Sequence, residues 1–170
     1  MKGEIVSESA VRFVRIFDAP PGKVWAFLTD SALLPEWYGD GAIEPREGGR
    51  VSLMGGHIRG VVTGWRLEKF LGYTWNVFQP GEDAASSSEA VGQTKESGWP
   101  VSYLEFALDG SRLTLTHRPI PASMQNQTMM GWHTMLGLIE AGLRGEYPKR
   151  ADLFSKNAAL YGVDMTKLNR

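Results

Sequence analysis

The side chains best suited to acid–base chemistry in this 170-residue chain are its three histidines, His57, His117 and His133. Histidine titrates close to neutral pH, so it can transfer a proton or bind a metal ion. The three positions lack the HxH or HExxH spacing that preorganises a zinc site, and no metal is expected. His57 and His117 are candidates for proton transfer to a bound carbonyl compound. The alternative for each is a buried histidine that is hydrogen-bonded to its neighbours.

Other reactive groups are scarce. The chain has no cysteine, which excludes disulfides, thiol nucleophiles and thiolate metal sites. Ser52, Ser102 and Thr114 lie in strand-like segments without a Gly-x-Ser-x-Gly turn. The glycine-rich run 55–60 lies between strands, so it does not direct a helix N-terminus at a phosphate. No cofactor is expected, and a binding protein is favoured over an enzyme.

Aromatic side chains are abundant and include six tryptophans. Trp37, Trp75 and Trp132 are expected either in the ordinary core or in the wall of a ligand pocket. Arg59 lies two residues after His57, on the same side if that strand is regular. An inward Arg59 would need a carboxylate partner or an acidic ligand, whereas an outward Arg59 would be solvated. The predicted pocket residues are Trp37, Tyr38, His57, Arg59, Tyr73, Trp75, His117, Trp132 and His133.

The elements that must position these side chains begin with a strand at about 11–17, which is rich in Val, Ile and Phe. Pro20 and Pro21 suit the first turn of a short helix. Asp30 can cap a second short helix, which ends at the glycines of 39–41. Two short helices are therefore expected directly after the first strand.

Residues from about 43 to 119 show the pattern of an antiparallel meander, because glycine-containing turns separate runs of β-branched and aromatic residues. Asp109-Gly110 is a strong hairpin signal. In the strand that follows, His117 shares its parity with Leu113 and Leu115, so it is expected to face inward. The polar segment 80–98 is expected to be a mobile loop or an extended hairpin tip.

A long amphipathic helix is expected near the end, because apolar residues recur in steps of three and four. Its three glycines, Gly131, Gly137 and Gly142, predict close packing or a bend at one of them. His133 lies nearly a quarter turn from the centre of the apolar stripe, at the edge of the pocket or outside it. The stripe consists of Met129, Trp132, Leu136, Ile139 and Leu143.

This order of elements predicts an α+β fold in which a curved antiparallel sheet wraps around the long helix and encloses a cavity. Residues 1–145 are expected to form that domain. Residues 146–170 are expected to form a tail of one or two short helices. The tail can pack on its own domain or on a second copy of the chain, which would give a homodimer.

Several short motifs, in order over about residues 10–145, resemble a known family. The first three are typical of the opening of START-like (SRPBCC) helix-grip domains. The later ones resemble the bacterial branch of that superfamily named after the activator of the 90-kilodalton heat-shock ATPase (AHSA-type). The motifs are 19–25 (APPGKVW), 33–39 (LLPEWYG), 48–51 (GGRV), 60–62 (GVV), 71–75 (LGYTW), 112–117 (RLTLTH) and 131–133 (GWH).

The resemblance implies a helix-grip fold with an internal pocket between the sheet and the long helix. Its superfamily includes lipid and hormone carriers, aromatic cyclases, some hydrolases and co-chaperones. The expected function is therefore binding of a small hydrophobic or aromatic ligand. The alternatives are a histidine-assisted cyclase or hydrolase, and a protein that stimulates a chaperone ATPase.

Charge and hydropathy limit the partners. Eighteen Lys and Arg residues against nineteen Asp and Glu give a net charge of −1, which provides no overall attraction to nucleic acid or an anionic membrane. The first residues lack the apolar run of a signal peptide, and no segment has the length and apolarity of a membrane span. A cytoplasmic protein with a small-molecule partner is expected.

Overall fold

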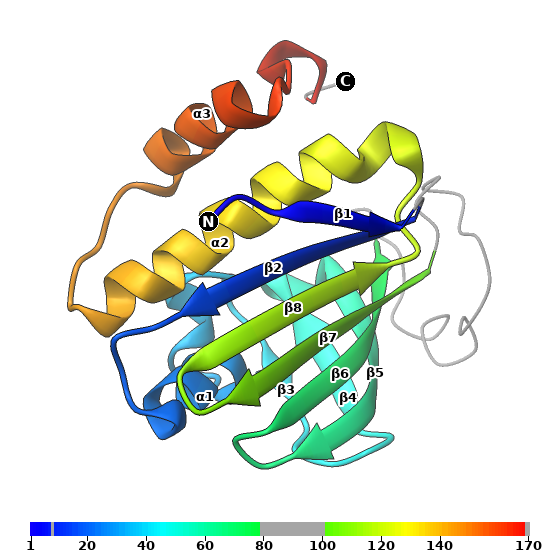
Figure 1. The fold of residues 1–170 in the computed structure, drawn as a ribbon. Coiled ribbons are helices and arrows are strands. Elements are labelled where there is room, and N and C mark those ends of the chain that lie inside the picture. The colour runs from blue at the N-terminus through cyan, green and yellow to red at the C-terminus, as the bar shows by residue number, and fades with distance from the viewer. Residues whose placement is uncertain (8, 79–100, 169–170) are drawn as a thin grey trace.

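The computed structural model describes residues 1–7, 9–78 and 101–168. Within these ranges, a curved antiparallel sheet of eight strands, in the order β1-β2-β8-β7-β6-β5-β4-β3, supports the long helix α2 (Gln125–Leu143) on its concave face (Figure 1). This arrangement confirms the predicted α+β helix-grip fold. The segment 80–98, expected to be a mobile loop or an extended hairpin tip, lies outside the described residues. The strands are β1 (Glu4–Ser7), β2 (Ala10–Ile16), β3 (Ala42–Ile43), β4 (Arg50–Leu53), β5 (Ile58–Arg66), β6 (Phe70–Val77), β7 (Ser102–Asp109) and β8 (Arg112–Arg118).

Two short helical segments follow β2, as the sequence predicts. Pro21 occupies the first turn of α1 (Pro21–Thr29), where its missing N–H is not needed. The Asp30 carboxylate accepts a hydrogen bond of 2.9 Å from the Ala32 N–H and so stabilises the turn between them. The second segment is a single 3-10 turn, η1 (Leu34–Glu36). The remaining helices in the described part of the chain are the 3-10 turns η2 (Met54–Gly56), η4 (Ala122–Met124) and η5 (Met165–Lys167), and α3 (Arg150–Tyr161).

The sheet begins earlier than the sequence predicts, because β1 pairs with β2 ahead of the expected first strand. Glu4 stands opposite Arg12, and the two side chains form an exposed ion pair of 2.6 Å. Ile5 and Val6 are both exposed, so this short edge strand shows no alternation of apolar and polar residues. Without that alternation the sequence gives no signal for β1.

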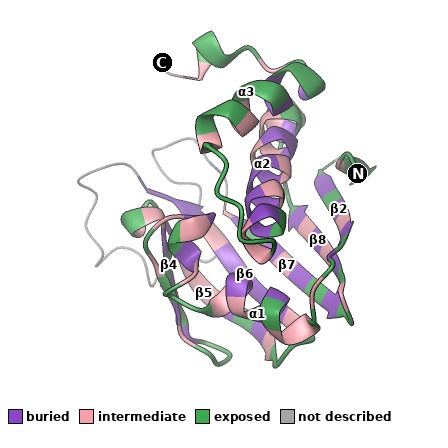
Figure 2. Cartoon of the chain, turned by 90° about the vertical axis from the view of Figure 1, so that its left-hand side faces the viewer, coloured by how far each residue is buried: buried purple, intermediate pink, exposed green. Residues whose placement is uncertain are grey.

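The buried face of α2 closes the concave side of the sheet, and its outer face carries α3 (Figure 2). Trp132, Leu136 and Ile139 of the predicted stripe are at most 3% exposed. They pack in one core with sheet residues such as Phe13 and Leu115. Burial of these large apolar side chains on both layers holds the helix against the sheet.

The close packing predicted for one helix glycine occurs at Gly142. A Cβ atom there would lie 2.7 Å from the buried Phe27 ring, whereas at Gly137 it would lie 4.0 Å from Leu153.

We expect Gly137→Ala to raise the free energy of unfolding by up to about 1 kcal/mol through helix propensity. Gly142→Ala should instead lower it by roughly 1 kcal/mol, because overpacking outweighs the same gain. Urea denaturation of both variants measures the difference, and equal gains would mean that Phe27 moves aside without cost.

The tail packs on its own domain. Asn157 of α3 donates a hydrogen bond of 2.9 Å to the buried Thr134 hydroxyl of α2. At the start of α3, the Arg150 guanidinium donates to the backbone carbonyls of Trp37 and Tyr38, which ties the tail to the end of η1. These contacts pack α3 against α2 and the end of η1 of the same chain. Self-association stays a prediction.

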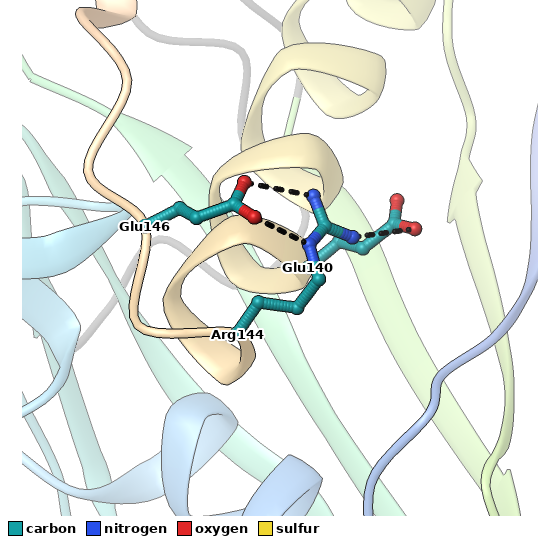
Figure 3. Close-up of polar contacts among 3 residues, drawn as sticks. All are labelled: Glu140, Arg144 and Glu146. Atoms are coloured by element: carbon teal, nitrogen blue, oxygen red, sulfur yellow. Dashed lines mark hydrogen bonds and ion pairs between the residues drawn. The ribbon is translucent and has the colours of Figure 1, made fainter.

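A surface ion-pair network covers the last turn of α2 (Figure 3). Arg144 donates to both carboxylate oxygens of Glu146 and to one of Glu140, each at 3.2 Å. All three side chains are about half exposed or more. Solvent-exposed pairs of this kind contribute little to stability. We therefore assign the network only a small role in stabilising the end of α2.

Candidate functional site

A cavity of about 250 Å³ lies between the N-terminal half of α2 and the ends of β5 and β6. Its buried lining residues, called here the floor, are Ile58, Val77, His117, Trp132 and Met135. Its exposed or half-buried lining residues are Met54, His57, Trp75, Gln127, Thr128 and Gly131. Because the second group reaches the surface, the cavity opens between the turn η2 and the first turns of α2.

His117 sits in a chain of three hydrogen-bonded side chains. The indole Nε1–H of Trp132 donates to His117 Nδ1 at 3.0 Å. Indole nitrogen is only a donor, so Nδ1 carries no proton and the neutral ring has its proton on Nε2. That N–H then donates to Ser102 Oγ at 2.7 Å. The chain joins β7, β8 and α2 and uses both imidazole nitrogens.

This environment keeps His117 neutral. Complete burial lowers the pKa of His117 to about 3, because desolvation penalises the charged imidazolium. With Nδ1 occupied by an indole N–H, no lone pair is open to a substrate. The inward orientation of His117 is thus as predicted. The bonds around it are those of a structural histidine and give no support to the proton-transfer alternative at this position.

Two indoles form the aromatic wall of the cavity. The rings of Trp75 and Trp132 lie 5.4 Å apart at 60°, and Trp75 lies 5.3 Å from the His117 ring. Tyr38 packs behind them, 6.0 Å from Trp75 and 5.8 Å from Trp132. The Trp75–Trp132, Trp75–His117 and Tyr38–Trp132 pairs are edge-on, and this packing stabilises the rings beyond what burial alone would do. The wall is therefore a rigid apolar surface.

The polar rim consists of His57, Gln127 and Thr128. His57 ends the turn η2, and its backbone N–H donates to the Met54 carbonyl at 3.3 Å. The expectation that His57 lies on a strand is wrong, because Met54, Gly55 and Gly56 all adopt positive φ and turn the chain sharply before β5. The turn nevertheless brings His57 to the mouth of the cavity.

Three of the predicted pocket residues lie behind the wall, outside the cavity lining. Trp37, Tyr38 and Tyr73 are at most 1% exposed. The Trp37 indole donates to the Phe27 carbonyl at 2.7 Å, and the hydroxyls of Tyr38 and Tyr73 bond each other at 2.9 Å. Burial raises the pKa of both tyrosines, so both stay neutral. They support the wall from behind.

Arg59 lies on the opposite face of the sheet, so its predicted place in the pocket is wrong. It pairs in register with Asn76, which alternates with the cavity-lining residues Trp75 and Val77. Its Nε–H donates to the Gly56 carbonyl at 2.9 Å. Its guanidinium lies 4.4 Å from the centre of the Phe78 ring. Arg59 does face outward, but it is half-buried against an aromatic ring rather than solvated.

His133 also lies outside the cavity, on the side of α2 that faces α3. Its Nδ1 and the Tyr161 hydroxyl are 2.9 Å apart, and its ring packs edge-on against Phe13. Burial lowers the pKa of His133 to about 4, and the charge of Arg15 adds to this effect. The three histidines therefore do not converge. Among the described residues, no group of three or more His, Asp or Glu side chains is placed to hold a metal ion.

Several lining residues were missed by the sequence analysis although α2 carries a signal for them. Thr128, Gly131 and Met135 were not expected in the pocket, yet they lie on one helical face with the predicted Trp132, at steps of three, one and three along α2. A polar residue and a glycine weaken the apolar pattern there. The expected stripe was therefore centred on the neighbouring core face.

Fold and site together define a helix-grip domain, in which a bent antiparallel sheet and one long helix enclose a cavity that opens to solvent. The sequence matches the family model described as "Activator of Hsp90 ATPase homolog 1-like protein" over residues 18–144. The chain belongs to this family, within the START-like superfamily that its motifs resemble. No curated protein is a significant match to the sequence.

Solved structures share the fold at low sequence identity. CalU16 from Micromonospora echinospora is 20% identical, with a TM-score of 0.63 over 90% of this chain and 84% of its own. A protein from Bordetella parapertussis is 20% identical, with a TM-score of 0.67 over 94% of this chain and 88% of its own. An HSP90 activator from Plasmodium falciparum is 21% identical, with a TM-score of 0.61 over 82% of this chain and 98% of its own.

The helices that the structure describes include none with the length and apolarity needed to cross a bilayer.

Proposed function

We propose that this protein binds a small hydrophobic or aromatic ligand in the cavity between α2 and the sheet. The observation that carries the proposal is an open cavity of about 250 Å³ with a wall of two indoles, Trp75 and Trp132. An apolar protein cavity of about 150 Å³ already accommodates benzene. A mostly apolar pocket with a few polar groups at one place is the usual form of a small-molecule site.

The test uses the intact protein and a fluorescent aromatic probe. Native mass spectrometry of freshly purified protein first shows whether a small molecule has co-purified. 2-Naphthol is then titrated while tryptophan emission is recorded, because Trp75 and Trp132 contact the cavity directly. We expect saturable quenching at one probe per chain. No co-purified molecule together with no saturable change in emission would contradict the proposal.

A second candidate function is stimulation of a chaperone ATPase. The family match over residues 18–144 and the fold shared with an HSP90 activator support it. Its measurement is the ATP hydrolysis rate of a 90-kilodalton chaperone with and without this protein at micromolar concentration. An increased rate is expected under this proposal, and an unchanged rate overturns it. Ligand binding and ATPase stimulation are measured separately, so each is decided on its own result.

A further inference from the structure

We propose that the ligand has one or two aromatic rings and a polar group at one end only, and that it binds with its apolar end on the floor. This inference rests on the proposed ligand-binding function and specifies the class and orientation of the ligand. The polar end would stay at the rim, beside His57, Gln127 and Thr128. The proposal follows from how the polar atoms of the cavity are already paired.

The floor offers a ligand little to bond with. Among the described residues, the side-chain nitrogens of the floor are the two ring nitrogens of His117 and the indole nitrogen of Trp132, and these are bonded to one another or to Ser102. A ligand hydroxyl or carbonyl placed on the floor would lose its water without gaining a partner. An unsatisfied buried polar group costs about 1–3 kcal/mol. The floor therefore selects an apolar end.

The rim offers the opposite chemistry. Gln127 and Thr128 lie half-buried in the first turns of α2, and His57 is exposed across the opening. An amide, a hydroxyl and an imidazole can each donate and accept hydrogen bonds. A polar group of the ligand at this position keeps both protein partners and water. The two ends of the cavity thus orient an amphipathic ligand in one direction.

The size and walls of the cavity select flat rings. A volume of about 250 Å³ exceeds what a single benzene ring needs and lies below the roughly 300–1,000 Å³ of typical drug-sized pockets. Trp75 and Trp132 present ring surfaces on which an aromatic ligand can stack or pack edge-on. Met54 and Met135 add flexible thioether contacts that adapt to the ring outline. A single aromatic ring or two fused rings fit the volume of the cavity and the shape of its walls.

The first experiment compares two probes that differ only at the buried end. 2-Naphthol has one hydroxyl, and 2,6-dihydroxynaphthalene has a second at the far end of the same rings. We expect the diol to bind at least about fivefold more weakly, since its second hydroxyl would be unpaired on the floor. Equal or tighter binding of the diol overturns the inference but leaves ligand binding established. Failure of both probes, with no co-purified molecule, contradicts the proposed function itself.

The second experiment removes hydrogen-bonding groups from the rim. The double variant Gln127→Leu with Thr128→Val should reduce the preference of the protein for 2-naphthol over naphthalene, while naphthalene binds as before or more tightly. Asn126→Leu is the matched control, because Asn126 is exposed on the same turn of α2 and does not line the cavity. An unchanged preference in the double variant contradicts the proposed orientation. If that variant does not fold, the comparison of the two probes on the unmodified protein still decides the matter.

Discussion

Replacement of Gly131 by leucine is expected to weaken 2-naphthol binding by at least about tenfold, a loss of about 1.4 kcal/mol or more. Gly131 lines the cavity, and apart from its chain neighbours and the nearby helix backbone no atom of the described residues lies within 4 Å of the position of a Cβ. The new side chain would therefore occupy the space of the ligand without disturbing the core. Leucine also has a higher helix propensity than glycine. The variant should be at least as stable as the natural protein.

Two controls separate blockage from a general effect on the helix. Gly131→Ala adds a single methyl group and should weaken binding less than leucine does. Gly137→Ala alters the same helix on the side that faces Leu153, away from the cavity lining, and should leave the affinity unchanged. Affinities come from tryptophan quenching, and stabilities come from urea denaturation. Natural affinity in a folded Gly131→Leu protein would place the ligand elsewhere.

The second large effect is expected in the dependence of the free energy of unfolding on pH. The pKa of His117 is about 3 in the native protein, compared with an ordinary value of 6.5. Between these values the unfolded chain binds a proton that the native protein does not, so the free energy of unfolding falls as pH falls below 6.5. For His117 alone the loss between pH 7 and pH 4 should be ~3 kcal/mol. His133, whose pKa is lowered to about 4, acts in the same direction but less strongly because its ring is half exposed.

The variant His117→Gln tests whether His117 causes this loss of stability at low pH. A glutamine amide can accept from the Trp132 indole and donate to Ser102, as the imidazole does, but it does not titrate. We expect its free energy of unfolding, measured by urea denaturation from pH 7 to pH 4, to fall by ~3 kcal/mol less than that of the natural protein. Parallel profiles for the two proteins would mean that His117 takes up no extra proton on unfolding.

The class of fold follows from local patterns in the sequence. Steps of three and four placed the long helix, and the alternation of Leu113, Leu115 and His117 with polar residues gave the inward face of β8. Both patterns depend only on the backbone periodicity of one element, so they can be recognised without knowledge of its partners. The same reasoning fails for β1, where exposure on both faces removes the pattern.

The members of the site were settled by the tertiary structure. His57 still belongs to the end of the turn η2 and has helical φ/ψ, whereas Arg59 is already in β5, so the two side chains point to different places although they are only two positions apart. Helix periodicity placed His133 at the edge of the pocket or outside it, but its hydrogen-bond partner, Tyr161 of α3, could not be predicted from any local pattern. His117 lost its free nitrogens to Trp132 and Ser102, which lie on other elements. The sequence alone thus determined the α+β fold, the long helix and the inward face of β8. Which of these side chains meet depended on long-range packing, because hydrogen-bond partners and burial are set by elements that are distant in the chain.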